Sequence, residues 1–183
     1  MNKKTIGIIV GSLRRDSFSK KVAQYVADLL EEQFVVTFVD ISDLALFNQD
    51  MESDPPQEWL RLRQEVKAAD AVLFVTPEYN RSMPAVLKNA LDVGSRPYTD
   101  NAWNGKPAAA IGVSPGSIGA FGAVNHLHQS AACVGLLMMS QPEAYLGAIM
   151  AALGDTGVEG EKVQGILQRF VDAFAAWVNR LAS

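Results

Sequence analysis

Short apolar runs alternate with longer amphipathic segments along this chain. Runs rich in β-branched and aromatic residues predict strands, and segments with apolar residues three or four positions apart predict helices. The run at residues 70–76 is apolar almost throughout, which is typical of a parallel sheet covered on both faces. The predicted strands span residues 4–10, 34–40, 70–76, 107–113 and 134–139, and the predicted helices span residues 17–32, 57–69, 84–94, 120–132 and 159–181.

This alternation predicts an α/β fold with one domain over residues 1–183. Right-handed crossovers favour a flavodoxin-like three-layer sandwich with a five-stranded parallel sheet in the order 2-1-3-4-5. Gly94 is predicted to cap the end of a helix. The segment around Pro142 is predicted to be a loop, followed at 145–153 by a loop or a short helix. In such a sheet, ligands bind beyond the carboxyl ends of the strands, near the first and third strands.

The composition narrows the classes of function. The chain of 183 residues has a net charge of −4 and a pI of about 5.2, which argues against a general nucleic-acid or anionic-membrane surface. No apolar run reaches the roughly 18 residues of a membrane span and no signal peptide is recognisable, so a cytoplasmic protein is expected. The lone Cys133 excludes an internal disulfide and is predicted to pack in the core. His126 and His128 do not share a helix face, and no metal site is predicted.

The segment at residues 11–21, after the first predicted strand, carries the richest chemistry. A strand that passes through a small-residue loop into a helix brings backbone N–H groups and the positive end of the helix together, which suits a phosphate. We therefore predict that this loop holds the phosphate of flavin mononucleotide (FMN). Further hydroxyl and guanidinium donors in the loop are Ser12, Arg14, Ser17 and Ser19.

Other kinds of phosphate loop do not fit this segment. The segment lacks the Gly-Lys-Ser/Thr ending of a Walker A loop, the second and third glycines of the dinucleotide fingerprint, and the cysteine of a Cys-based phosphatase loop. An ordinary strand-to-helix turn with Ser17 as the N-cap of the helix is the alternative interpretation.

Two further irregular segments follow the third and fourth predicted strands and are expected at the same edge of the sheet. In the first, residues 77–84, backbone groups and the Asn80 side chain can bond to the polar rim of a ring, and Tyr79 supplies a flat surface. The second, residues 114–122, contains three glycines that let the backbone approach a ligand closely. The alternatives are a strand-end turn before Pro84 and a flexible connection.

The chain resembles the NADPH-dependent FMN reductase family, which includes chromate and quinone reductases and azoreductase-like members. The resemblance extends over nearly the whole chain and is carried by Gly11-Ser12-x-Arg14-x-x-Ser17-x-Ser19, Pro77-Glu78-Tyr79-Asn80 and Leu87-Lys88-Asn89-Ala90-Leu91-Asp92. It implies a flavodoxin-like fold, bound FMN, NADPH or NADH as electron donor, and a homodimer or homotetramer with helix 84–94 at the contact. The implied FMN-binding residues are Ser12, Arg14, Ser17, Phe18 and Ser19 at the phosphate, and Pro77, Glu78, Tyr79, Asn80, Ser114, Pro115 and Gly116 around the isoalloxazine ring.

The activity implied is transfer of a hydride from NAD(P)H through FMN to quinones, flavins or other small oxidants, including chromate and azo compounds. The cofactor carries this chemistry, so no catalytic side chain is expected. The main alternative is a flavodoxin-type electron carrier or a flavin-binding module without reductase activity. Such carriers usually have a Thr-rich first loop and a more acidic surface, and this chain has neither feature clearly. A receiver domain needs an acidic pocket at the strand ends, whereas the first predicted strand ends in Val10-Gly11.

Overall fold

The computed structural model describes residues 3–155 and 157–182. Within them, six strands form one parallel sheet with the order β2-β1-β3-β4-β5, and β6 also pairs with β4. This order confirms the predicted flavodoxin-like α/β fold. The strands are β1 (Thr5–Val10), β2 (Val35–Phe38), β3 (Ala71–Thr76), β4 (Pro107–Val113), β5 (Leu137–Met138) and β6 (Ala144–Leu146).

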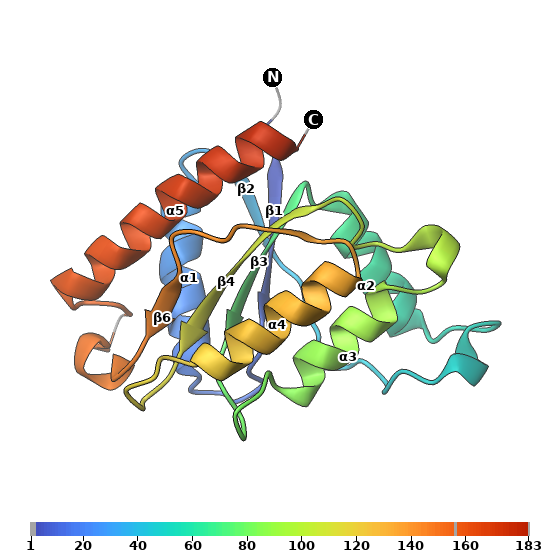
Figure 1. Ribbon diagram of the computed structural model, residues 1–183, viewed down its shortest axis with the longest axis horizontal. Coiled ribbons are helices and arrows are strands. Elements are labelled where there is room, and N and C mark those ends of the chain that lie inside the picture. Colours follow the sequence, from blue (N-terminus) through green and yellow to red (C-terminus); the bar gives the residue numbers. More distant parts are fainter. Residues whose placement is uncertain (1–2, 156, 183) are drawn as a thin grey trace.

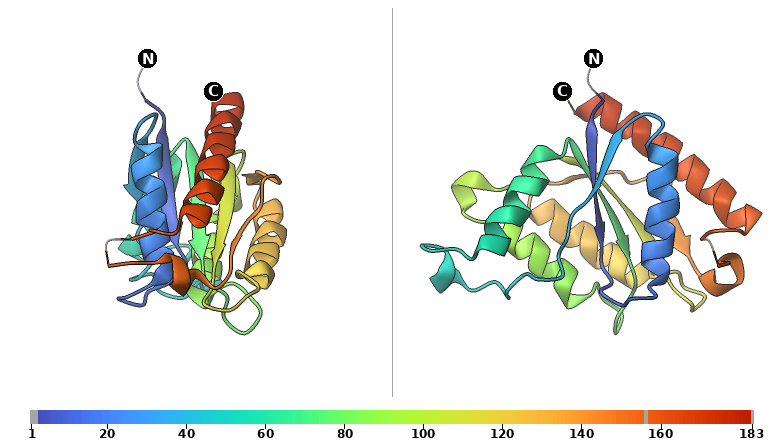
Figure 2. Two further views of the ribbon diagram at one scale, coloured as in Figure 1. Left: turned by 90° about the vertical axis from the view of Figure 1, so that its left-hand side faces the viewer. Right: turned by 180° about the vertical axis from the view of Figure 1, so that it is seen from behind.

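The helices form a layer on each face of the sheet (Figure 1). Helices α1 and α5 cover one face, and α2, α3 and α4 cover the other, as the side and rear views confirm (Figure 2). The α-helices are α1 (Phe18–Leu30), α2 (Gln57–Ala68), α3 (Ala85–Gly94), α4 (Phe121–Cys133) and α5 (Glu161–Leu181), and the short 3₁₀ helices are η1 (Gln49–Met51), η2 (Tyr98–Asp100) and η3 (Ile149–Ala152).

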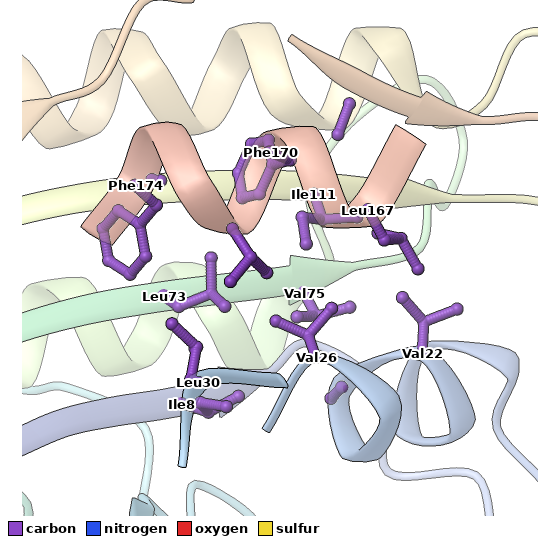
Figure 3. Close-up of a cluster of buried hydrophobic side chains, with 14 of the residues drawn as sticks. Ile8, Val22, Val26, Leu30, Leu73, Val75, Ile111, Leu167, Phe170 and Phe174 are labelled. Carbon is purple, nitrogen blue, oxygen red and sulfur yellow. The ribbon is translucent and has the colours of Figure 1, made fainter. Parts of the chain in front are cut away.

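Two apolar cores lie between these layers. In the first, side chains of α1 and α5 meet the sheet, and Val26, Phe170 and Phe174 pack over Ile8 and Leu73 (Figure 3). The second lies under α2, α3 and α4 and includes the fully buried rings of Trp59, Phe74 and Trp103. Because each large side chain that is fully buried stabilises the fold by about 1.5–3 kcal/mol, these cores fix the sheet on both faces.

The fifth predicted strand, residues 134–139, is shorter and is divided. Only β5 pairs there, through Leu137 and Met138, with the start of β4. The chain then leaves the sheet and returns as β6, which pairs with the end of β4 in the segment predicted to be a loop, so that prediction was wrong for residues 144–146. The interruption contains Pro142, which has no N–H to donate to a ladder and follows a cis peptide bond.

Gly94 has a different role from the predicted one. It is the last residue of α3, and Ser95 is the C-cap. A Cβ atom on Gly94 would lie 2.4 Å from Nε1 of the fully buried Trp103, whose indole donates to the Leu91 carbonyl oxygen at 3.0 Å. The glycine therefore leaves room for an indole ring rather than for an unusual backbone conformation.

A close approach of two strand ends positions the functional loops. A Cβ atom on Gly11, just after β1, would lie 2.7 Å from Oγ1 of Thr76 at the end of β3. Gly11 also donates its backbone N–H to the carbonyl oxygen of Val75 at 2.9 Å. Any larger side chain at position 11 would push apart the loops that follow these two strands.

Candidate functional site

The three loops predicted to carry chemistry meet at one edge of the sheet, the lower edge in Figure 1. They enclose a cavity of about 390 Å³, a size within the usual range for small-ligand sites. Residues from all three loops contribute, as predicted from the order of the strands. The cavity is lined by Ser12, Arg14, Ser17, Phe18, Ser19, Pro77, Glu78, Tyr79, Val113, Ser114 and Pro115.

One end of this cavity is formed by the start of α1. Ser17 is the N-cap, and its side chain accepts the backbone N–H of Lys20 at 3.3 Å. The N–H groups of Phe18 and Ser19, in the first turn, have no partner within the helix. The side chains of Ser12, Ser17 and Ser19 are 4%, 2% and 1% exposed. Backbone donors and hydroxyl groups therefore converge on one sheltered point.

Arg14 adds a positive charge at this end of the cavity. Its guanidinium carbon lies 4.7 Å from the centre of the Phe18 ring, so the side chain stacks on an aromatic face that also lines the cavity. A stacked guanidinium keeps its N–H groups free for an anion. Arg14 and the helix start together have the chemistry of a phosphate-monoester site.

The second loop is a tight turn. Tyr79 and Ser82 exchange two backbone hydrogen bonds of 3.0 Å, and the residues between them, Asn80 and Arg81, have φ values of 51° and 66°. Asparagine tolerates this left-handed conformation better than most residues. Asn80 is exposed at the tip and lines a groove between α3 and α4 instead of the cavity. Of the four residues predicted around the ring in this loop, Pro77, Glu78 and Tyr79 line the cavity.

Glu78 ties the second loop to the third. Its Oε2 accepts the backbone N–H of Gly122 at 2.8 Å and that of Ala123 at 3.3 Å, at the start of α4. The N-cap residue of α4, Ala120, has no side chain that could do this. The carboxylate is only 12% exposed, and its contact with the exposed Arg81 is longer, at 3.4 Å. Glu78 therefore caps a helix from another loop.

The third loop begins at the opposite wall of the cavity. Ser114 Oγ accepts the backbone N–H of Gly116 at 3.0 Å, and the Gly116 carbonyl oxygen accepts from Ala148 at 2.9 Å. Gly116 therefore supports the wall, while Ser114 and Pro115 line the cavity. Val113, which also lines it, was missed from the sequence because an apolar strand residue carries no signal of its own.

The histidines and the cysteine lie outside this cavity. His126 Nδ1 is 2.9 Å from the hydroxyl oxygen of Ser82, and burial lowers the pKa of His128 below 6.5 although Glu143 opposes this shift. Cys133 is exposed, so its predicted burial was wrong: it is the last residue of α4 and faces outward. Within the described residues no cluster of histidine, cysteine and carboxylate side chains could hold a metal ion.

A polar pair lies near the third loop. Tyr145 donates its hydroxyl proton to Oε1 of Glu143 at 2.8 Å, and its ring packs edge-on against Phe121, with 5.3 Å between ring centres. Burial, together with the neighbouring carboxylate, raises the pKa of Tyr145 to about 12. The hydrogen bond to Glu143 ties together two residues of the segment that follows β5.

The cavity has an anion-binding end, and the Glu78 carboxylate in its lining is engaged by backbone N–H groups of α4. Donors at the α1 start fit a phosphate, and the walls at Pro77–Tyr79 and Ser114–Pro115 leave a slot for a planar group. These features fit FMN. Among the helices of the described part of the chain, none combines the length and apolar character that crossing a bilayer requires.

Comparison with known proteins agrees with this geometry. Residues 5–151 match the family described as NADPH-dependent FMN reductase. A quinone reductase from Pseudomonas putida is 49% identical over 175 residues, which cover 95% of this chain and 94% of that protein. A 2-hydroxy-1,4-benzoquinone reductase from a Burkholderia species is 46% identical over 174 residues, with coverage of 94% and 95%.

Comparison with solved structures supports the flavodoxin-like fold. FerB, described as a flavoenzyme NAD(P)H:(acceptor) oxidoreductase from Paracoccus denitrificans, superposes with a TM-score of 0.93 at 44% identity and covers 98% of this chain and 100% of that one. An archaeal flavodoxin superposes with a TM-score of 0.61 at 14% identity, covering 96% and 99% of the two chains, and so supports the fold alone.

Proposed function

This chain belongs to the NADPH-dependent FMN reductase family, and on that premise we propose that it is an FMN-dependent NAD(P)H oxidoreductase whose acceptors are quinones and other small oxidants. The relatives named as quinone reductases, at 46–49% identity over almost the whole chain, support the acceptor class. When bound, FMN supplies the redox chemistry, which converts one NAD(P)H, one proton and one quinone into NAD(P)⁺ and a hydroquinone.

The observation that carries this proposal is the meeting of three loops around one cavity. We place the FMN phosphate at the start of α1, within reach of the three buried serines and Arg14. The isoalloxazine ring would lie between Pro77–Tyr79 and Ser114–Pro115. Each charge-assisted hydrogen bond to the phosphate contributes about 1.5–3 kcal/mol, so several of them with ring burial reach the roughly 8–12 kcal/mol of micromolar to nanomolar binding.

The residues of this chain act by binding, orienting and sheltering the cofactor. In the ring-side loops the backbone N–H groups of Tyr79 and Ser114 already donate to the carbonyl oxygens of Ser82 and Leu146, so these two residues would position a ring by packing rather than by backbone donation. We assign no side chain an obligatory proton-transfer role.

The test is spectroscopic and kinetic. Purified protein is titrated with FMN and followed by flavin absorbance, and the FMN-saturated protein is then mixed with NADPH or NADH and 1,4-benzoquinone. Flavin binding with quinone-dependent loss of NAD(P)H supports the reductase. Flavin binding without NAD(P)H oxidation would identify an electron carrier or flavin-binding module, and failure to bind FMN would overturn the cofactor assignment as well.

We also propose that residues 1–183 form one flavodoxin-like domain that assembles as a homodimer or homotetramer. Support comes from the groove of about 820 Å³ between α3 and α4, lined in part by Met83 and His126, and from Tyr79, which is 49% exposed beside it. Light scattering that gave only the monomer mass would refute the assembly. The cytoplasm, which supplies NAD(P)H, is the proposed location, and cell fractionation tests it.

A further inference from the structure

A second cavity adjoins the candidate FMN cavity on the far side of the first loop. It has a volume of about 480 Å³ and lies between α1 and the end of β2. Ser12 lines both cavities, so a single residue forms the boundary between them. Apart from Ser12, the side chains that enclose this second cavity, which we call the β2 groove, have no part in the proposed FMN site.

An aromatic face stands open in the β2 groove. Phe38 is 48% exposed and belongs to neither buried core. It pairs with Ile8 of β1, which is fully buried under α1, so both side chains point to the same face of the sheet. Leu13, which is 44% exposed, adds apolar surface near the boundary with the FMN cavity. A flat apolar group can therefore rest on the exposed Phe38 ring.

Charged groups of both signs border the same groove. Asp40, just after β2, lines the groove, and its Oδ1 accepts the backbone N–H of Ser42 at 2.8 Å. Lys20 of α1 is exposed, and within residues 3–155 and 157–182 its ammonium group makes no ion pair. The groove thus offers a hydrogen-bond acceptor and a cation in addition to an aromatic surface.

We propose that the β2 groove binds the adenosine 5′-phosphate part of the nicotinamide donor; this inference rests on the reductase function proposed above. The adenine stacks on Phe38, the ribose hydroxyls donate to Asp40, and Lys20 attracts the phosphate. An acidic residue after the second strand binds an adenosine ribose in the same way in dinucleotide-binding folds. The two cavities adjoin at Ser12, so an extended dinucleotide held in the β2 groove would pass this residue on its way to the FMN cavity.

The first test measures binding without redox chemistry. ADP-ribose, which lacks the nicotinamide, is titrated by calorimetry into the FMN-saturated protein and into Phe38→Ser and Lys20→Gln variants. We expect Phe38→Ser to weaken binding about tenfold, a typical loss for one base–aromatic stack, and Lys20→Gln to weaken it by up to about fivefold. Val35→Ser is the matched control, because Val35 is 47% exposed on the same strand but does not line the groove.

The second test separates the donor from free adenine nucleotides. Steady-state KM values are compared for NADH and for reduced nicotinamide mononucleotide, which lacks the adenosine phosphate. We expect Phe38→Ser to raise the KM for NADH about tenfold, in line with the loss of one stack, and to change the ratio of the two KM values by the same factor. Equal KM changes for both donors, or ADP-ribose binding that Phe38→Ser leaves intact, would overturn the inference. If wild-type protein binds FMN but oxidises neither donor, the reductase function itself has failed.

Discussion

Replacing Glu78 tests how the two loops beside the candidate FMN cavity are held together. Its carboxylate accepts two backbone N–H groups at the start of α4, from Gly122 at 2.8 Å and from Ala123 at 3.3 Å. In Glu78→Ala these two amides lose their acceptor, and the N-cap residue Ala120 cannot replace it. The change therefore removes a connection between the second and third loops without removing a buried apolar side chain.

The magnitude follows from these contacts. A hydrogen bond to a charged group contributes about 1.5–3 kcal/mol, and the 3.3 Å contact is the weaker of the two. An anion at a helix N-terminus adds about 0.3–1 kcal/mol. We expect Glu78→Ala to lower the free energy of unfolding by about 2–4 kcal/mol. In Glu78→Gln an acceptor oxygen remains and only the charge is lost, so the expected loss is about 1–2 kcal/mol.

The assay is urea denaturation of the FMN-free protein, followed by FMN titration of each variant. Arg81→Ala is the matched control, since Arg81 pairs with the same carboxylate at 3.4 Å but is 75% exposed. Such an exposed pair contributes about 0–1 kcal/mol. The expected order of stability loss is Glu78→Ala, then Glu78→Gln, then Arg81→Ala, with weaker FMN binding in the same order. Equal losses for the alanine variants at 78 and 81 would refute the capping role.

Three further changes test other parts of the structure. Arg14→Ala should weaken FMN binding by about 1.5–3 kcal/mol, measured by fluorescence titration, and unchanged affinity would remove Arg14 from the phosphate site. Gly94→Ala should destabilise the protein by about 1–3 kcal/mol in urea denaturation, because the new methyl group meets the Trp103 ring at 2.4 Å, whereas a gain in stability would contradict that contact. The stability due to neutral His128 is fully present above its unfolded pKa of 6.5 and declines as the pH falls through its lower folded pKa. Below pH 6.5 the melting temperature of His128→Gln should therefore fall less than that of the wild type. Parallel curves of melting temperature against pH for the two proteins would count against this.

The order of the sheet was predictable because its main strands carry their signal locally. Residues 71–76 of β3 are buried throughout, and an apolar run of this length has few alternatives to a central parallel strand. The strands that pair with the outer edge of β4 were harder to predict from the sequence. There β5 and β6 share one partner strand, and β6, which has only three residues, becomes a strand because it pairs with the end of β4.

The residue types of the candidate site were predictable from the sequence, but the backbone conformation and the long-range contacts of its loops were not. Small residues, serines and Arg14 after β1 suit anion binding, and they do line the cavity, although Ser17 also serves as the N-cap of α1. The position of Asn80 at the tip of a tight turn, with a left-handed backbone and beside the groove between α3 and α4, was not predicted from the local pattern. Glu78 was expected beside a ring, and its contact with α4, 44 residues further along the chain, leaves no trace in the local pattern.

The cavity therefore depends on residues that do not line it. The loop after β1 reaches the loop after β3 because Gly11 has no side chain to meet Thr76. The loop after β3 reaches α4 because Gly122 has no side chain. A Cβ atom there would lie 2.8 Å from the Arg81 carbonyl oxygen and 3.0 Å from Glu78 Oε2. Each loop is thus positioned by backbone contact with the next one. A larger residue at position 11 or 122 should open the cavity while every lining side chain is still present, so the local motifs are necessary for the FMN site but do not by themselves create it.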